Sequence, residues 1–308
     1  MSQQQFDKNV PTAMREAILD NPFKDNFAKR RFHAGLFKAF ILLATCLAMM
    51  ILAVLLWRIG SQGEPWLKWS FLTSFPSRIP ARAGIMSALI GSASIIVLTG
   101  FIAVILGVGA AVYLEELSIK NKLSRFIELN IANLAGIPSL VYGILGLAVF
   151  VRLLGFGRSI LAAAFTMAMM ILPVIIISSR EALKGVPQSI RLAALALGAT
   201  RWQTTWHHVL PAAMPGMMTG IILAVSRALG EAAPLIIVGG VTYIAFLPKS
   251  LFDSFTTLPI QIFNWAGRPQ EEFQAIAAAA IIVLVGLVLI TNGIAIIIRA
   301  RLENENRW

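Results

Sequence analysis

Residues 36–57 read LFKAFILLATCLAMMILAVLLW, an apolar run that carries a single charged side chain, Lys38. A hydrophobic run of about 20 residues is long enough to cross the roughly 30 Å hydrocarbon layer of a membrane as a helix. A helix is expected because the backbone polar groups of a lipid-facing segment have no water to bond and must bond one another. The run therefore predicts a transmembrane helix near the start of the chain.

Similar apolar runs follow along the rest of the chain and bring the prediction to about six spans. The other predicted spans are Ile85–Leu114, Phe126–Val151, Ile160–Ser178, Ala213–Gly240 and Phe273–Ile298. The composition agrees, because 57% of the 308 residues are hydrophobic and 13% are charged, whereas soluble domains carry about 25% charged residues. The predicted fold class is therefore all-α, a polytopic membrane protein.

The distribution of Lys and Arg predicts how the chain is oriented. Six spans place both termini on one side, and that side holds 17 Lys and Arg residues against 8 on the other. Basic residues accumulate in cytoplasmic loops, so we expect both termini in the cytoplasm. We expect residues 1–35 to form a cytoplasmic N-terminal segment, either amphipathic on the membrane surface or disordered. Residues 36–308 are then the transmembrane domain, without a cleavable signal peptide.

The net charge of +11 comes from basic residues that are dispersed between the apolar runs. This distribution fits topology and contact with anionic lipid better than nucleic-acid binding. Cys46 is the single cysteine of the chain, so the sequence contains no intrachain disulfide. No cysteine–histidine spacing typical of a metal site is present.

Two predicted loops are long, at about 180–212 and 241–272. The first is expected to hold a helix between Pro187 and Gly198, because proline suits a helix start and glycine a helix end. Its residues Ile190, Ala193, Ala194 and Leu197 recur at the spacing of one helix face. A second short helix is predicted over Arg201–Val209, ending at Leu210-Pro211. The first helix serves either as a docking surface or as a segment resting on the membrane. The loop at 241–272 is predicted to be irregular.

The predicted span 213–240 contains two charged residues, Arg227 and Glu231, near its middle. A charge at the centre of a span costs about 2.5–3.5 kcal/mol on insertion scales. Residues four apart share a helix face, so the two form either a structural ion pair or a polar lining for a substrate. Gly230 and Pro234 weaken the helix at this point. Gly216-x-x-x-Gly220 predicts close helix packing.

The loop at 180–212 resembles the EAA loop of ABC importer permeases, which docks into a groove on the ATPase subunit. The resemblance rests on Ala193-Ala194-x-x-x-Gly198, then nine residues, then His208-Val209-Leu210-Pro211. The sequence departs from the family pattern at Leu192, where Glu is usual, and at His208, where Ile is usual. The coupling-loop residues that the resemblance implies are Arg191, Ala193, Ala194, Gly198, Leu210 and Pro211.

Three further stretches are similar to the permeases of the phosphate ABC importer. Residues 227–234 read RALGEAAP and resemble that family's Arg-x-x-Gly-Glu-Thr-Ala-Pro segment, with Ala232 in place of Thr. Residues 136–143 read GIPSLVYG and resemble its Pro-Ser-Val-Val/Tyr-Gly run. Residues 257–265 read TLPIQIFNW and are similar to the PstA branch in particular. The similarity runs from about Gly84 to Ile298.

The resemblance implies a subunit of an ATP-driven importer in the bacterial cytoplasmic membrane. Its partners would be a second, similar permease, two ATPase subunits that bind ATP and Mg, an external phosphate-binding protein and membrane lipid. No cofactor is expected in this chain. Arg227 and Glu231 would line the substrate path. Ser139, a polar residue in the predicted span 126–151, either lines the path with them or bonds a neighbouring helix. The Arg227 guanidinium would contact phosphate through its fork of donors, and Glu231 would limit how tightly the anion is held.

Two other classes of protein are weighed against this one. The sequence has no ATP-binding Gly-x-x-x-x-Gly-Lys-Ser/Thr loop, no zinc-protease spacing and no hydrolase Gly-x-Ser-x-Gly motif, so an enzyme is disfavoured. The long Ala-rich loop argues against a stand-alone channel or carrier. Within the importer family, a permease for another anion or an organic solute remains an alternative to phosphate.

Overall fold

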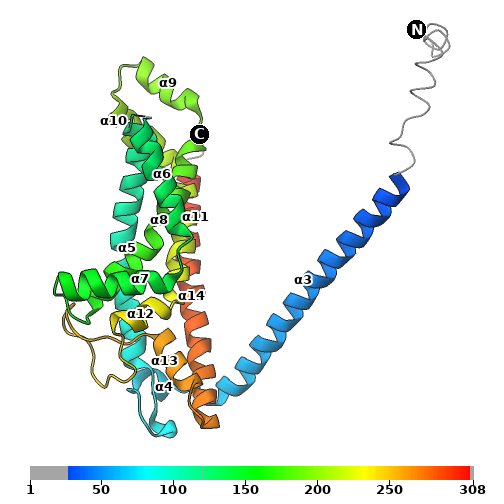
Figure 1. The fold of residues 1–308 in the computed structure, drawn as a ribbon, viewed down its shortest axis with the longest axis vertical. Coiled ribbons are helices and arrows are strands. Elements are labelled where there is room, and N and C mark those ends of the chain that lie inside the picture. The colour runs from blue at the N-terminus through cyan, green and yellow to red at the C-terminus, as the bar shows by residue number, and fades with distance from the viewer. Residues whose placement is uncertain (1–26, 120, 306–308) are drawn as a thin grey trace. The chain divides into compact units, whose positions relative to one another are not determined.

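The computed structural model describes residues 27–119 and 121–305, and all regular elements in those residues are helical. The chain divides into two compact units, 1–58 and 59–308, which are described separately. Helix α3 (Phe27–Gly63) contains the predicted span 36–57 and continues across the boundary between the units (Figure 1). Most of the predicted N-terminal segment 1–35 lies outside the described residues.

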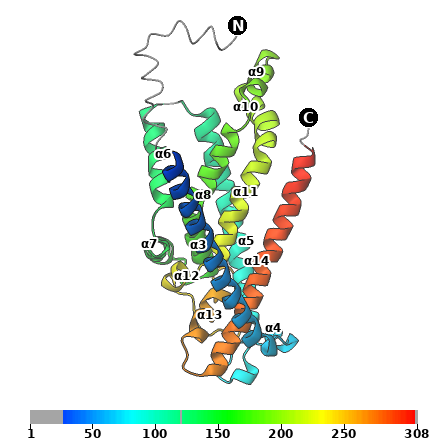
Figure 2. The same ribbon diagram turned by 90° about the vertical axis from the view of Figure 1, so that its right-hand side faces the viewer.

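The unit 59–308 is built on four long helices that run side by side (Figures 1 and 2). These helices are α5 (Met86–Val112), α8 (Ile160–Lys184), α11 (Leu210–Leu229) and α14 (Glu271–Glu305). Together with α3 they make five helices long and apolar enough to cross a membrane, or six spans if a bent helix pair is included. The prediction of an all-α protein with about six spans is confirmed.

Small side chains bring α5, α8 and α11 close together. The core between these helices contains Ala103, Ala163, Ile175 and Ala224, all essentially inaccessible to solvent. A Cβ added at Gly216 would lie 3.0 Å from the Ala182 Cβ, and one at Gly220 would overlap Ser178. Glycine at these positions therefore lets α11 approach α8 closely, as the Gly-x-x-x-Gly spacing predicts.

The predicted span Phe126–Val151 is wrong as one straight helix. The structure has α6 (Lys122–Ala135), then α7 (Ser139–Gly146) and the π-helix η4 (Leu147–Leu153), with a bend of 106° between α6 and the α7–η4 segment. The break falls at Gly136-Ile137-Pro138, because proline has no N–H to donate and disfavours helical backbone in the residue before it. The Tyr142 hydroxyl donates to the Leu134 carbonyl at 2.7 Å and joins the two arms across the bend.

The predicted span Ala213–Gly240 is also placed incorrectly. A single helical stretch runs from Arg201 to Leu229 through α10 (Arg201–Thr204), the π-helix η5 (Thr205–Val209) and α11. The predicted stop at Leu210-Pro211 is therefore wrong. Helix α11 ends before Gly230, and α12 (Ala233–Val238) follows after a short break. Pro234 explains the break, because it has no N–H to donate to the carbonyl of Gly230.

The end of the bundle opposite α9 (Gln188–Ala196) is closed by short helices. The elements there are η1 (Glu64–Trp66), α4 (Trp69–Thr73), η2 (Pro80–Arg82) and α13 (Leu258–Ala266). The prediction that the loop 241–272 is irregular throughout is wrong, since α13 lies within it and buries Trp265 against Phe71. The irregular part is tied to α5, where Ser87 Oγ donates to the Ile244 carbonyl at 2.8 Å.

The packing of α8 against α11 predicts that Gly220→Ala destabilises the protein by about 1–3 kcal/mol, because the added Cβ overlaps Ser178 and overpacks the interface. Gly286→Ala in α14 is the matched control, since nothing lies within 4 Å of a Cβ at that position. This control is expected to be neutral or slightly stabilising, because alanine favours a helix over glycine. The measurement is the apparent melting temperature of the detergent-purified protein. Equal melting temperatures for the two variants would contradict the close packing.

Candidate functional site

The break between α11 and α12 separates the two charged residues that the sequence places on one helix face. Arg227 lies in the last turn of α11, whereas Glu231 follows the end of that helix. The prediction that both residues lie on one shared helix face is therefore wrong. The described residues contain no ion pair between Arg227 and Glu231.

Glu231 instead meets Ser139, the first residue of α7. The Ser139 hydroxyl donates to Glu231 Oε1 at 2.7 Å, and both residues are partly buried. Helices α7 and α12 lie against each other here, and a Cβ added at Gly143 would lie 2.8 Å from the Pro234 Cα. The two breaks, at 136–138 and 230–232, are thus brought together in space. Ser139 and Glu231 are two of the three residues predicted to line a substrate path.

Arg227 lies on the exposed side of α11. It is exposed in the unit 59–308, while the next two residues, Ala228 and Leu229, are buried in the core. The preceding residue, Ser226, bonds through its hydroxyl to Asn292 Oδ1 of α14. Arg227 therefore offers a guanidinium at the same break as the Ser139–Glu231 pair without being bonded to it.

The second candidate region is α9 with the residues after it. Pro187 stands immediately before the first residue of the helix. Gly198 has a φ of +86°, a conformation that favours glycine, so the turn predicted at this residue is confirmed. The predicted face is not a single surface. Ile190 and Ala194 pack inward against the rest of the chain, whereas Ala193 is exposed.

The outward surface of this region carries large apolar side chains. Leu197 lies beyond the last turn of α9 and is 90% exposed. Leu192 and Leu195 are exposed on the helix itself. Trp202 and Trp206 are also exposed, and their rings stack with centroids 5.8 Å apart. Leu210 and Pro211 lie at the start of α11, in line with the helix that carries the two tryptophans.

Arg191 fixes α9 to the ends of two long helices. Its guanidinium bonds both oxygens of Glu116, with Nη2 to Oε1 at 2.6 Å and Nε to Oε2 at 3.2 Å. It also donates to the carbonyls of Val186 at 2.7 Å and Leu183 at 2.9 Å. Glu116 belongs to the π-helix η3 (Tyr113–Leu117), which extends α5. Glu116 is not among the residues predicted from the sequence, because its partner Arg191 lies 75 residues away.

The Arg191–Glu116 pair predicts that Glu116→Gln destabilises the protein by about 2–4 kcal/mol, because both side chains are nearly buried and the substitution leaves a guanidinium without its carboxylate. The control is Glu181→Gln, the same chemical change in an exposed ion pair with Lys184. An exposed pair contributes about 1 kcal/mol or less. The apparent melting temperature should fall for Glu116→Gln and stay nearly unchanged for Glu181→Gln. An equal decrease in both would show that Arg191 does not hold α9.

The helical bundle, its paired helix breaks and the α9 region together define the membrane-embedded permease of a transporter. Residues 103–304 match the family of binding-protein-dependent transport system inner membrane components. The chain belongs to this family. It is therefore a multi-pass membrane protein and the permease component of a binding-protein-dependent ABC transporter.

Two relatives illustrate the similarity in sequence. The chain is 35% identical over 242 residues to the probable ABC transporter permease protein YqgI of Bacillus subtilis, an alignment that covers 75% of this chain and 82% of YqgI. It is 29% identical over 299 residues to the phosphate transport system permease protein PstA 1 of Mycobacterium tuberculosis, covering 93% and 97% of the two chains.

The fold has solved counterparts. A chain of the bacterial alginate ABC transporter, solved in complex with a periplasmic protein bound to an alginate pentasaccharide, matches with a TM-score of 0.64 and 14% identity. The match covers 88% of this chain and 96% of the other. It shows that the fold is that of a type I ABC importer permease.

Proposed function

We propose that this chain passes inorganic phosphate through the bacterial cytoplasmic membrane, along a path shared with a second permease. The similarity to PstA proteins, which covers 93% of the chain in one relative and 75% in another, supports phosphate as the substrate. The sequence Arg227-x-x-Gly230-Glu231, which resembles the corresponding segment of phosphate permeases, supports the same substrate.

The observation that carries the proposal is the meeting of two helix breaks around Ser139, Glu231 and Arg227. Non-helical backbone at membrane depth is tolerated where it is buried in protein or lines a water-filled cavity. A charged residue among apolar helices costs several kcal/mol unless a partner or a pathway accommodates it. The Ser139 hydroxyl and the Glu231 carboxylate meet at such a break, and Arg227 lies one turn before it, at the end of α11. These three residues are therefore expected to line the path of a polar substrate.

Arg227 is assigned the contact with phosphate. Its guanidinium offers a planar fork of donors that matches two oxygens of a phosphate group. Its exposure in the unit 59–308 leaves it accessible to a substrate or to a second permease. Glu231 is held by the Ser139 hydroxyl at a fixed position. A carboxylate there repels the anion, so that phosphate is bound weakly enough to leave.

The α9 region is assigned to coupling with the ATPase subunits. The exposed Leu192, Leu195 and Leu197 give a docking groove an apolar surface to bind. Arg191 connects that surface to the ends of α5 and α8, so movement of α9 is transmitted to the bundle. The proposed partners are a PstC-like permease, two PstB-like ATPases that bind ATP and Mg, and an external PstS-like phosphate-binding protein.

The proposal predicts that Arg227→Gln combined with Glu231→Gln abolishes phosphate uptake while the complex still assembles. If the charges serve structure alone, removing both should be tolerated, because a buried ion pair is often replaceable by neutral groups. Arg227→Lys should retain part of the uptake, since it keeps the charge and loses the fork. The measurement is uptake of labelled phosphate at matched protein levels, with ATPase activity followed in parallel. Arg152→Gln, at an exposed position in η4, is the control.

Near-normal phosphate uptake by the double variant would remove Arg227 and Glu231 from the pathway. If the unmodified complex instead takes up a different anion or an organic solute, and phosphate does not compete, the family assignment stands and phosphate is the wrong substrate.

The orientation of the chain remains a prediction that reporter fusions can test. The excess of basic residues predicts that tags at both termini and within 185–200 report the cytoplasm. A tag within 245–256 should report the opposite side. Tags at the two termini on different sides would contradict an even number of spans, and with it the cytoplasmic location of α9.

A further inference from the structure

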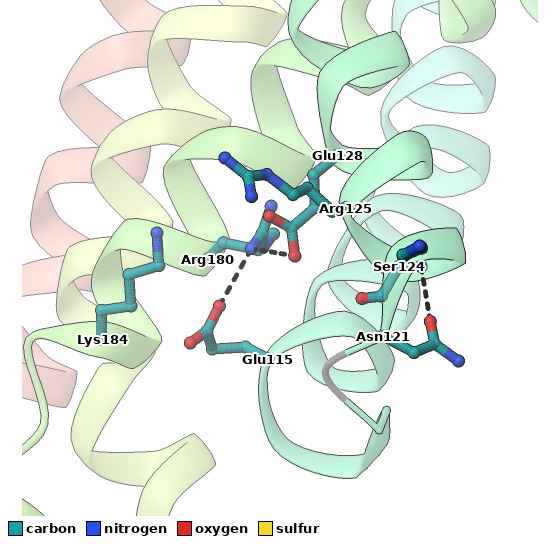
Figure 3. A pocket seen from close by; sticks show the side chains of 8 residues that line it. Glu115, Asn121, Ser124, Arg125, Glu128, Arg180 and Lys184 are labelled. Carbon is teal, nitrogen blue, oxygen red and sulfur yellow. Dashed lines mark hydrogen bonds and ion pairs between the residues drawn. The ribbon is translucent and has the colours of Figure 1, made fainter.

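A charged cleft lies at the end of the bundle that carries α9, separate from the Ser139–Glu231 site. Its volume is about 700 Å³, and it opens between η3, α6 and the end of α8 (Figure 3). The residues that line it are Glu115, Asn121, Lys122, Ser124, Arg125, Glu128, Arg180 and Lys184. None of these residues belongs to the proposed substrate path.

Arg180 forms the fixed floor of the cleft. Its Nη2 pairs with Glu115 at 3.2 Å and with Glu128 at 2.9 Å, and its side chain is 12% exposed. The two ion pairs join η3, α6 and α8, three elements that are distant in the sequence. Its Nε is buried without a hydrogen-bond acceptor among the described residues. The cleft walls are thus held in place by charge-assisted bonds rather than by loose surface side chains.

The lining has more positive than negative charge. Four basic residues face two carboxylates, and both carboxylates are already bonded to Arg180. Lys122 and Arg125 are exposed and form no ion pair with the described residues. Lys184 pairs with Glu181, which lies outside the lining. Figure 3 shows Arg125 of α6 and Lys184 of α8 near the Arg180–Glu115 pair. An anion in the cleft would meet these cations without displacing the Arg180 ion pairs.

The helix beside the cleft indicates the kind of anion. The α6 residues Leu123 and Phe126 alternate with Lys122 and Arg125 in sequence, and both are more than 60% exposed. A basic cluster next to exposed apolar side chains is the arrangement that phospholipids find at membrane proteins, with the phosphate on the cations and the acyl chains on the apolar surface.

We propose that the cleft is a binding site for a phosphate group, supplied by the head group of an anionic phospholipid such as phosphatidylglycerol. Free inorganic phosphate offers the same chemistry and is the second possible source. A bound head group between α6 and α8 would connect the bent helix pair to the end of the bundle that carries Arg191. The site would thereby make the arrangement of α9 sensitive to the occupant of the cleft.

The test uses the intact protein, purified with the subunits that accompany it, and the double variant Lys122→Gln with Arg125→Gln. These substitutions leave the Arg180 ion pairs intact. The control is Arg152→Gln with Lys249→Gln, which removes the same charge from two exposed residues outside the cleft. In one arm, phosphatidylglycerol retained from mixed phosphatidylglycerol and phosphatidylcholine nanodiscs is measured by native mass spectrometry. In the other arm, labelled inorganic phosphate is measured by equilibrium dialysis in phosphatidylcholine nanodiscs, in the Arg227→Gln background.

In the lipid arm, we expect the unmodified protein and the control to retain phosphatidylglycerol. The double variant should bind it with about a thirtyfold weaker affinity and lose it. If the loss appears only in the phosphate arm, the site binds a phosphate group and its source is the free ion. Equal binding by the double variant and the control in both arms would overturn the proposal. Because the Arg227→Gln background removes the pathway contact, failure of the proposed substrate path leaves this result unaffected.

Discussion

A backbone N–H or C=O inside an apolar environment has no water to bond, so every part of a membrane segment must pair its own polar groups. In this chain long helices meet the constraint. Each interruption of a helix costs free energy, because it leaves backbone polar groups without their helical partners. The interruptions at 136–138 and 230–232 each contain proline or glycine, and they lie against each other through Gly143 and Pro234. The two interruptions therefore lie in one place, and the polar side chains Ser139 and Glu231 bond each other there.

The long helices can pack closely around the two interruptions because the residues at their contacts have small side chains. A Cβ at 107 or 220 would overlap Ile175 or Ser178, and a Cβ at 216 would lie only 3.0 Å from the Ala182 Cβ. Lipid tails are as apolar as the helix surfaces, so close van der Waals packing rather than exclusion of water has to hold such helices together. The same small residues fix how far α8 and α11 stand apart, and hence where the end of α11 and Arg227 are placed.

Charged side chains hold the end of the bundle that carries α9. Arg191 joins α9 to η3, and Arg180 joins η3 to α6 and α8. Both arginines are nearly buried and each bonds more than one acceptor, which makes these contacts stronger than exposed ion pairs. The turn at Gly198 then directs the chain into the stretch 201–229, so one continuous helix leads from the α9 region to the break beside Glu231.

The sequence by itself determined the helical class, the approximate spans, the Gly-x-x-x-Gly packing and the turn at Gly198. These features depend on local hydrophobicity, on backbone conformation and on hydrogen bonds between residues four apart, all of which a short stretch of sequence contains. It also located Arg227, Glu231 and Ser139 as unusual residues, because a polar group in an apolar run stands out. The tertiary structure alone decided how they are grouped. Glu231 does not share a helix face with Arg227 and accepts a hydrogen bond from Ser139, 92 residues away. Arg191 pairs with Glu116, 75 residues away. Such contacts depend on where two helices end and how they bend, and no local pattern in the sequence specifies the partner across that distance.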